Sequence, residues 1–146
     1  MAFKLVRSQK VDALSGVPLF SGLSKSQLSL VERSADEVHA DAGAVLAREG
    51  GLGREFLLIL DGRARVERNK RKLAQLGRGD FFGEMSLIDG EPRSASVIAE
   101  TPVTLLVMEG RSFRAVLEDA PPMARKIMMG LCQRLRRADD ELASRN

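Results

Sequence analysis

The chain of 146 residues carries 23 Lys and Arg against 20 Asp and Glu, which gives a formal net charge of +3 at neutral pH. Its length suits a single domain with a hydrophobic core, and its 44% of hydrophobic residues is ordinary for a soluble globular protein. Because the excess of positive charge is small and Trp and Tyr are absent, the composition argues against a surface dedicated to nucleic acid. It remains compatible with a small anionic ligand.

The cellular location is predicted from cysteine use and from hydropathy. One cysteine, Cys132, excludes an intramolecular disulfide framework and fits a reducing compartment; we expect it to be a packed thiol. No apolar run approaches the roughly 20 residues that span a bilayer. The start, Met1 to Lys4, lacks the apolar region of a secretory signal. We therefore expect a cytoplasmic protein that has no membrane partner.

The first 34 residues are predicted to form helices. Apolar residues recur at helical spacing in residues 1–14, and Gly16 and Pro18 then end that helix. Ser24 is a suitable N-cap for a second helix, from Lys25 to Arg33. We expect these helices to pack on the rest of the domain.

From residue 35 the apolar pattern changes to the alternation of strands. The run Glu55 to Leu60 is a strand, Asp61-Gly62 is a hairpin signal, and Asn69-Lys70 turns the chain again. Two further β-rich runs, 94–99 and 103–108, are separated by a short polar turn. Many short strands with glycine turns predict an antiparallel jelly-roll barrel over residues 35–109, and the fold class is α+β, mainly β.

Three features within this region suggest other functions. The loop Glu49-Gly50-Gly51-Leu52-Gly53 lacks the Lys-Ser or Lys-Thr of a phosphate-binding P-loop, so we expect a tight connection. The basic run from Arg63 to Lys72 alternates with other residues, which favours a solvated hairpin over a nucleic-acid surface. A metal-dependent enzyme on a barrel needs several histidines, and His39 is the only one. No catalytic constellation is present, so we expect neither an enzyme nor a metal.

Residues 82–95 carry the chemistry that the rest of the chain supports. A short helix from Glu84 to Ile88 follows Gly83, and its first backbone N–H groups attract an anion. A loop then brings back Arg93, whose guanidinium binds phosphate oxygens in a bidentate way. Glu84, an acceptor when ionised, suits a sugar hydroxyl.

The region from residue 110 to residue 146 is predicted to be helical. A helix spans Phe113 to Leu117, and Pro121-Pro122 opens the last helix. This helix carries an apolar stripe, which indicates packing on the barrel or on a second copy of the chain. Its basic residues are followed by acidic ones, which favours a solvated mixed face over a contact with the ligand. The stripe comprises Ile127, Leu131, Leu135, Ala138 and Leu142, and the basic residues are Arg134, Arg136 and Arg137.

The run Gly83-Glu84-Met85-Ser86-Leu87, followed after five residues by Arg93-Ser94-Ala95, resembles the phosphate-binding cassette of cyclic nucleotide-binding domains. The helices before the barrel are similar to those of the same family, so the resemblance covers most of the chain. It implies that Glu84 binds the ribose 2′-hydroxyl and that Arg93 and nearby amides bind the cyclic phosphate. The implied ligand-binding residues are Phe82, Gly83, Glu84, Met85, Ser86, Arg93, Ser94 and Ala95.

The resemblance implies a regulatory sensor that couples nucleotide capture to movement of the flanking helices. In the family a hydroxyl directly after the arginine can favour cGMP, yet bacterial cAMP regulators also carry serine there, so Ser94 leaves both ligands open and we expect cAMP. The last helix is expected to cover the base and to form a possible homodimer, and the effector protein is unknown. The alternatives are a degenerate domain that only binds proteins, or the sensor part of a longer transcription factor, channel or kinase regulator.

Overall fold

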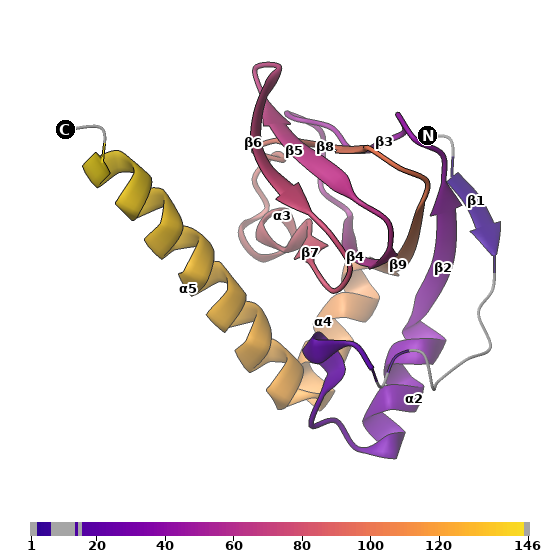
Figure 1. Cartoon of the computed structure of the whole chain (residues 1–146). Helices are drawn as coiled ribbons and strands as arrows, with labels where there is room; N and C mark the ends of the chain where they lie inside the picture. Colours follow the sequence, from indigo (N-terminus) through magenta and orange to yellow (C-terminus); the bar gives the residue numbers. More distant parts are fainter. Residues whose placement is uncertain (1–2, 7–13, 15, 145–146) are drawn as a thin grey trace.

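The computed structural model of the protein describes residues 3–6, 14 and 16–144. Two antiparallel sheets form a jelly-roll barrel, and helices gather at one end of it (Figure 1). The fold is α+β and mainly β, as the sequence predicted. The helices with bounds inside the described residues are one 3₁₀ helix and four α-helices: η1 (Pro18–Phe20), α2 (Lys25–Ser34), α3 (Glu84–Asp89), α4 (Gly110–Asp119) and α5 (Pro121–Ser144).

The two sheets contain five and four strands in the described residues. The first sheet has the order β1 (Phe3–Val6), β2 (Ala35–Ala40), β9 (Val103–Glu109), β4 (Glu55–Asp61) and β7 (Phe81–Phe82). The second has the order β3 (Val45–Ala47), β8 (Ser96–Ala99), β5 (Ala64–Arg68) and β6 (Arg71–Leu76). Every neighbouring pair is antiparallel.

Strand β4 is buried on both faces, which explains its continuous apolar run. Phe56 and Leu58 belong to the core between the first sheet and the helices, where Phe56 stacks on Phe113 of α4 with ring centroids 4.6 Å apart. Leu57 and Ile59 point to the opposite face and join the core inside the barrel. Successive side chains of a strand alternate between its faces, so β4 links the two cores.

The predicted N-cap of α2 is confirmed, with a reciprocal pair of hydrogen bonds. The Gln27 backbone N–H donates to Ser24 Oγ at 3.2 Å, and the Ser24 N–H donates to Gln27 Oε1 at 2.9 Å. This capping box satisfies two N–H groups that the helix itself leaves free. The predicted start of α5 at Pro121 is also confirmed, and the helix predicted from Phe113 to Leu117 lies within α4, which begins earlier, at Gly110.

The N-terminal helix predicted for residues 1–14 is wrong for residues 3–6. Residues 3–6 form β1, which pairs with β2 from Phe3 opposite Ala40 to Val6 opposite Glu37. The edge of β2 offers unpaired main-chain groups, and pairing with them outweighs the weak helical pattern of this segment. Of the rest of that prediction, Leu14 is helical, and residues 1, 2, 7–13 and 15 lie outside the described residues.

The Asp61-Gly62 turn was predicted to close a hairpin, and that prediction is also wrong. Strand β4 pairs with β7 and β9, whereas β5 pairs with β6 and β8, so the turn is a corner between the two sheets. A Cβ on Gly62 would lie 2.4 Å from the Pro102 carbonyl oxygen, so glycine allows this close crossing. The Asn69-Lys70 turn does join β5 to β6, and both residues have positive φ, as two-residue hairpin turns require.

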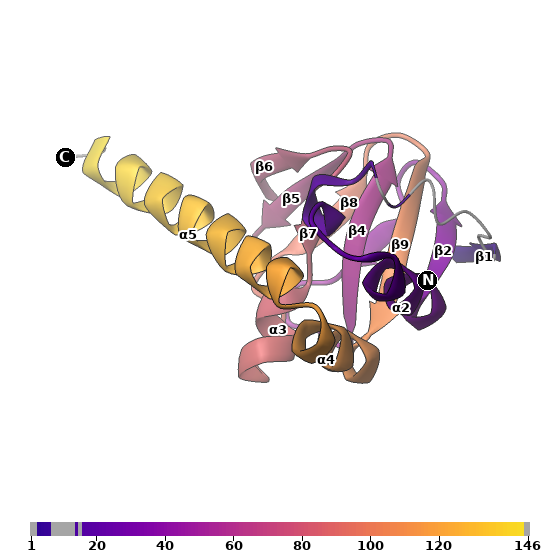
Figure 2. The ribbon, with the colours of Figure 1, turned by 90° about the horizontal axis from the view of Figure 1, so that it is seen from below.

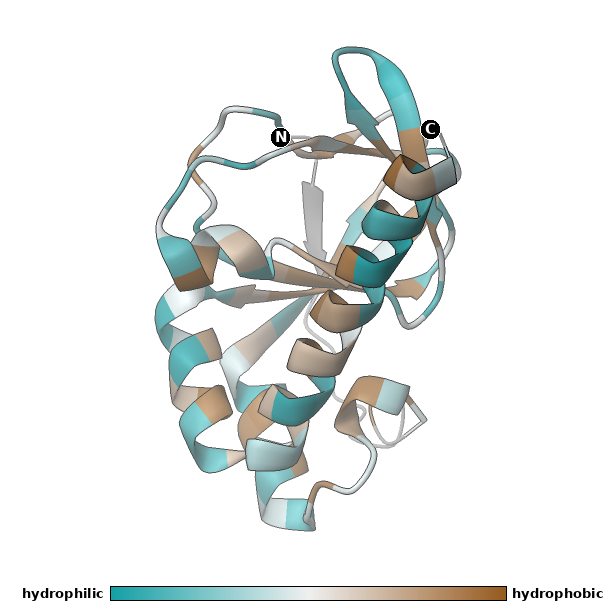
Figure 3. Cartoon of the chain, turned by 90° about the vertical axis from the view of Figure 1, so that its left-hand side faces the viewer, coloured by the Kyte–Doolittle hydropathy of each residue, from teal (hydrophilic) through white to brown (hydrophobic). Residues whose placement is uncertain are grey.

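Helix α5 extends beyond the barrel (Figure 2). Its first half is anchored, because Met123 and Ile127 are buried and Lys126 Nζ donates to the carbonyl oxygens of Pro18 and Ser21 at the end of η1. Hydrophobic and hydrophilic residues then alternate along the projecting half (Figure 3). Leu135 and Leu142 are 64% and 61% exposed, so the apolar stripe packs only in its first part.

Cys132 on α5 is exposed, so the prediction of a packed thiol is wrong. In the part of the chain that the structure describes, no helix is both long enough and apolar enough to cross a membrane.

Candidate functional site

A cavity of about 490 Å³ opens between the short helix α3, the β5–β6 hairpin and α5. All eight residues that the sequence singled out line this cavity: Phe82, Gly83, Glu84, Met85, Ser86, Arg93, Ser94 and Ala95. Strand β7 positions the first of them, α3 the next, and the loop that leads into β8 the last. The structure therefore brings Arg93 and Glu84 into one hollow.

Gly83 allows the main chain to turn from β7 directly into α3. Its φ of 91° lies in the left-handed region that other residues avoid. A Cβ at this position would lie 2.6 Å from the Glu55 carbonyl oxygen and 2.8 Å from Arg93 Nη1. Because glycine fits here, the first amides of α3 lie close to the arginine, and a helix start leaves those amides without intrahelical partners.

Arg93 is half-buried and its guanidinium is available to an anion. Its Nη2 donates to the Glu55 carbonyl oxygen at 3.2 Å, and it forms no ion pair with any carboxylate that the structure describes. Burial lowers the pKa of Arg93, and the nearby Glu55 and Glu84 carboxylates oppose that shift. A partly desolvated cation that lacks a direct counter-ion binds an oxyanion strongly.

Glu84 is the principal buried charge of the site, with 1% of its surface exposed. Its Oε1 accepts a hydrogen bond from Arg134 Nη1 at 2.5 Å, while its Oε2 is buried and has no hydrogen-bond partner among the described residues. Burial raises the pKa of Glu84, and the Arg134 cation works against that rise. A buried oxygen of this kind is costly unless a ligand supplies a donor.

Arg134 is the site residue whose place was predicted wrongly from the sequence. It was predicted to lie on a solvated face of the last helix, yet it binds Glu84, donates to the Phe81 carbonyl oxygen and lies 4.8 Å from the centroid of the Phe81 ring. Gly130, one turn earlier, allows the approach, since a Cβ there would lie 2.8 Å from the same ring. The signal available in the sequence was the small residue Gly130 four positions before Arg134, because residues four apart lie on the same face of a helix.

Comparison with known proteins assigns the chain to a family. Residues 37–120 match the family model described as "Cyclic nucleotide-binding domain". The chain belongs to the cyclic nucleotide-binding domain family. The match contains the whole 82–95 segment, so the resemblance seen in the sequence is confirmed.

Individual members of this family have similar sequences and folds. A cyclic nucleotide-gated potassium channel of Rhizobium etli is 38% identical over 114 residues, which cover 78% of this chain and 32% of the channel. The cyclic AMP receptor protein of Thermus thermophilus is 34% identical over 134 residues, which cover 88% of this chain and 62% of that protein. The crystal structure of the Thermus thermophilus catabolite activator protein has a TM-score of 0.77 at 35% identity, over 86% of this chain and 61% of that one. The chain thus spans about a third to three-fifths of these relatives.

A further part of the wall of the domain's cavity is built from the β5–β6 hairpin and α5. Val66, Leu73 and Leu76 supply apolar surface, and Gln133 and Arg137 of α5 supply polar groups. A flat ring with polar edges suits such a wall, because ligand sites combine apolar surface with a few placed polar groups. Arg137 and Gln133 were not predicted as site residues.

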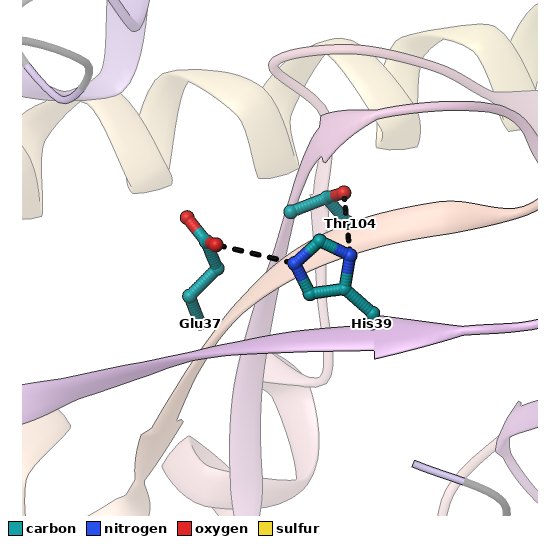
Figure 4. Close-up of polar contacts among 3 residues, drawn as sticks. All are labelled: Glu37, His39 and Thr104. Atoms are coloured by element: carbon teal, nitrogen blue, oxygen red, sulfur yellow. Dashed lines mark hydrogen bonds and ion pairs between the residues drawn. The ribbon is translucent and has the colours of Figure 1, made fainter. Parts of the chain in front are cut away.

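A second hollow of about 250 Å³ lies around His39 of the domain. His39 Nε2 lies 3.2 Å from Glu37 Oε2, and its Nδ1 lies 3.5 Å from Thr104 Oγ1 (Figure 4). Both ring nitrogens therefore have polar neighbours within the sheet. The described residues contain no group of three or more His, Cys, Asp or Glu side chains that could hold a metal ion.

Proposed function

We propose that this domain is a regulatory sensor that binds a cyclic nucleotide and that it binds cAMP in preference to cGMP. The observation that carries the proposal is the buried Oε2 of Glu84, which finds no partner in the described part of the chain and lies in the cavity that also holds the guanidinium of Arg93. A cyclic nucleotide has a hydroxyl donor and a phosphate anion, which match these two groups. The cavity volume lies within the range of small-molecule sites.

Each group has a separate role in the proposed complex. Arg93 and the backbone amides of residues 84–86 and 94–95 bind the cyclic phosphate, because a guanidinium and a helix start both favour an anion. Glu84 Oε2 accepts the hydrogen bond of the ribose hydroxyl. Phe82, Gly83 and Met85 shape the cassette around these contacts. Leu73 and Val66 contact the base.

Ligand capture is coupled to helix movement through two contacts. Arg134 of α5 binds the same carboxylate that binds the ribose, so ligand and helix share Glu84. Gly110, the first residue of α4, packs on Leu87 of α3, where a Cβ would lie 2.8 Å from Leu87 Cδ2. A shift of α3 therefore acts on α4 and α5 together, and η1 follows through Lys126.

The preference for cAMP rests on the chemistry of the base wall. Ser94 can bind either base, and the hairpin side of the wall is mainly apolar. Outside N9 adenine carries one polar atom fewer than guanine, so fewer of its polar atoms lack partners against the apolar hairpin side of the wall. The cyclic AMP receptor protein of Thermus thermophilus is among the relatives. Competition between cAMP and cGMP for the purified protein tests this preference.

The output passes to an effector protein or to a second copy of the chain. The exposed stripe of α5, which includes Leu135 and Leu142, offers a surface for pairing with its twin in a homodimer. The single thiol, Cys132, suits the reducing cytoplasm, where we place the protein. No catalytic role is assigned to the domain.

Thermal unfolding with and without nucleotide tests the proposed function. A ligand at 100 times its Kd adds about 2.7 kcal/mol to the free energy of unfolding, so cAMP raises the melting temperature by several degrees. An unchanged melting temperature at millimolar cAMP and cGMP favours the competing hypothesis, a domain that keeps the fold and binds only proteins. Glu84 would then be held permanently by Arg134.

A further inference from the structure

The glycine-rich segment 49–53, between β3 and β4, lies directly behind the proposed site. The Gly50 N–H donates to the Arg93 carbonyl oxygen at 2.8 Å, and the Arg93 N–H donates to the Gly51 carbonyl oxygen at 2.9 Å. Both backbone groups of Arg93 are therefore held by this segment. The Glu49 N–H also donates to Ser96 Oγ at 2.8 Å, which fixes the chain just after Arg93.

Gly53 of the same segment contacts the other half of the site. A Cβ on Gly53 would lie 2.3 Å from Ser86 Cβ, 2.7 Å from Ser86 Oγ and 3.4 Å from Arg93 Cγ. Its φ lies outside the left-handed range, so the requirement for glycine is steric rather than conformational. Gly53 is absent from the lining of the cavity and acts through its neighbours.

Ser86 lies in α3, which is only six residues long and begins with Glu84. Because carbon atoms in contact are about 3.5 Å apart or more, a side chain at position 53 would push α3 about 1 Å away from Arg93. The segment thus determines the separation of the two groups between which a cyclic phosphate and a ribose must fit.

We propose that segment 49–53 is the positioning element of the site and that Gly53 is its positioning residue. The expected effect on ligand binding rests on the proposed function. The contacts of segment 49–53 with Arg93 and Ser86 do not depend on it. The segment was expected to be a tight connection. Because its backbone hydrogen bonds hold Arg93, the segment contributes to ligand binding without contacting the ligand.

Three variants test the proposal: Gly53→Ala, the double variant Gly53→Ala with Ser86→Gly, and Ser86→Gly alone. The double variant removes the two Ser86 atoms that the new Cβ would meet and leaves Arg93 Cγ at 3.4 Å, an ordinary contact distance. Gly77→Ala is the matched control, because a Cβ at Gly77 meets nothing within 4 Å. Each is titrated calorimetrically with cAMP, and the amide resonances of residues 84–89 and 93 are recorded by NMR without nucleotide.

We expect Gly53→Ala to weaken cAMP binding roughly 10- to 100-fold and Gly77→Ala to change it less than about twofold. In the double variant, affinity should return to that of Ser86→Gly alone, and the amide shifts of α3 and Arg93 should revert. Wild-type affinity in Gly53→Ala, or a double variant no better than Gly53→Ala, would overturn the proposal. If the wild type binds neither cAMP nor cGMP, the proposed function fails, and unmoved amides in Gly53→Ala would then reject the positioning role independently.

Discussion

Arg134 Nη1 of α5 lies 2.5 Å from Glu84 Oε1 at the start of α3, across a sequence separation of 50 residues. This contact joins the projecting helix to the carboxylate that we assign to the ribose. The arginine side chain is 38% exposed and the glutamate side chain 1% exposed, so most of the desolvation falls on the glutamate. The pair therefore links the position of α5 to the charge of one buried group.

Glu84→Gln is expected to separate stability from binding. Because the pKa of Glu84 is raised by burial, the folded state binds a proton more tightly than the unfolded state, and this group favours folding at low pH. That contribution to the free energy of unfolding is lost as the pH rises from about 4.3, the pKa of a glutamate in the unfolded state, through the raised pKa of Glu84 in the folded state. At neutral pH the glutamine variant should unfold at the same temperature as wild type or higher, and it should lack this part of the pH dependence.

The same variant should bind cAMP about 10- to 100-fold more weakly, because a neutral amide replaces a charge-assisted hydrogen bond to the ribose. Melting curves between pH 4 and 8 and calorimetric titration provide the two measurements. A variant that loses stability at neutral pH while binding cAMP normally would contradict the assignment of Glu84.

Arg134→Ala should destabilise the protein, since it leaves the Glu84 carboxylate buried without its cation. Allowing for the exposure of the arginine, we expect a loss of about 1–2 kcal/mol in the free energy of unfolding at neutral pH. Arg136→Ala is the control, because that residue is exposed and forms no described contact with Glu84. Denaturant titration measures both, and equal effects would show that the ion pair is not a structural link.

Gly83→Ala should damage both folding and binding, whereas Gly90→Ala should affect folding alone. Both glycines have positive φ, so each substitution costs about 1 kcal/mol in backbone strain. A Cβ at Gly83 also meets the Glu55 carbonyl oxygen and Arg93, but a Cβ at Gly90 meets nothing within 4 Å. Affinity for cAMP, measured where both variants are folded, should fall only for Gly83→Ala. An equal loss would show that strain, not the close approach to Arg93, controls the site.

Leu135→Glu tests the pairing of α5 with its twin. A charge in the middle of an apolar seam should shift the protein from dimer to monomer, and sedimentation velocity reports the change. Arg136→Glu, next to it on an exposed part of the helix, is the matched control. If wild type and both variants sediment as monomers across the micromolar range, the homodimer is excluded and the stripe needs another partner.

The sequence predicted the parts of the site that depend on local spacing. Glu84 and Arg93 are nine positions apart in one turn–helix–loop unit, so their types and spacing were sufficient to place them together. Arg134 could not be placed in the same way, because its contact depends on how α5 crosses Phe81, and a helix presents several basic residues to choose from. Helical periodicity identifies a face but not its neighbour.

The wrong predictions about the fold also arise from contacts between residues that are far apart in the sequence. Residues 3–6 are extended because β2 has a free edge for them, and no local pattern reports that edge. Asp61-Gly62 has the composition of a hairpin turn, yet the strands on its two sides find partners elsewhere in the barrel. The glycines of segment 49–53 indicated a tight connection, but only the fold shows that this segment pairs with the backbone of Arg93.

Calorimetric titration of Arg93→Ala and Arg93→Lys with cAMP tests the central claim most directly, with Arg63→Ala, an exposed residue at the barrel corner, as the control. Losing a bidentate contact to phosphate in a partly dry site should cost about 2–4 kcal/mol, or roughly 30-fold to several hundred-fold in affinity. The lysine variant should recover only part of the lost affinity, because lysine keeps the positive charge but cannot form the bidentate contact. Equal affinities of wild type and Arg93→Ala for cAMP would contradict the account.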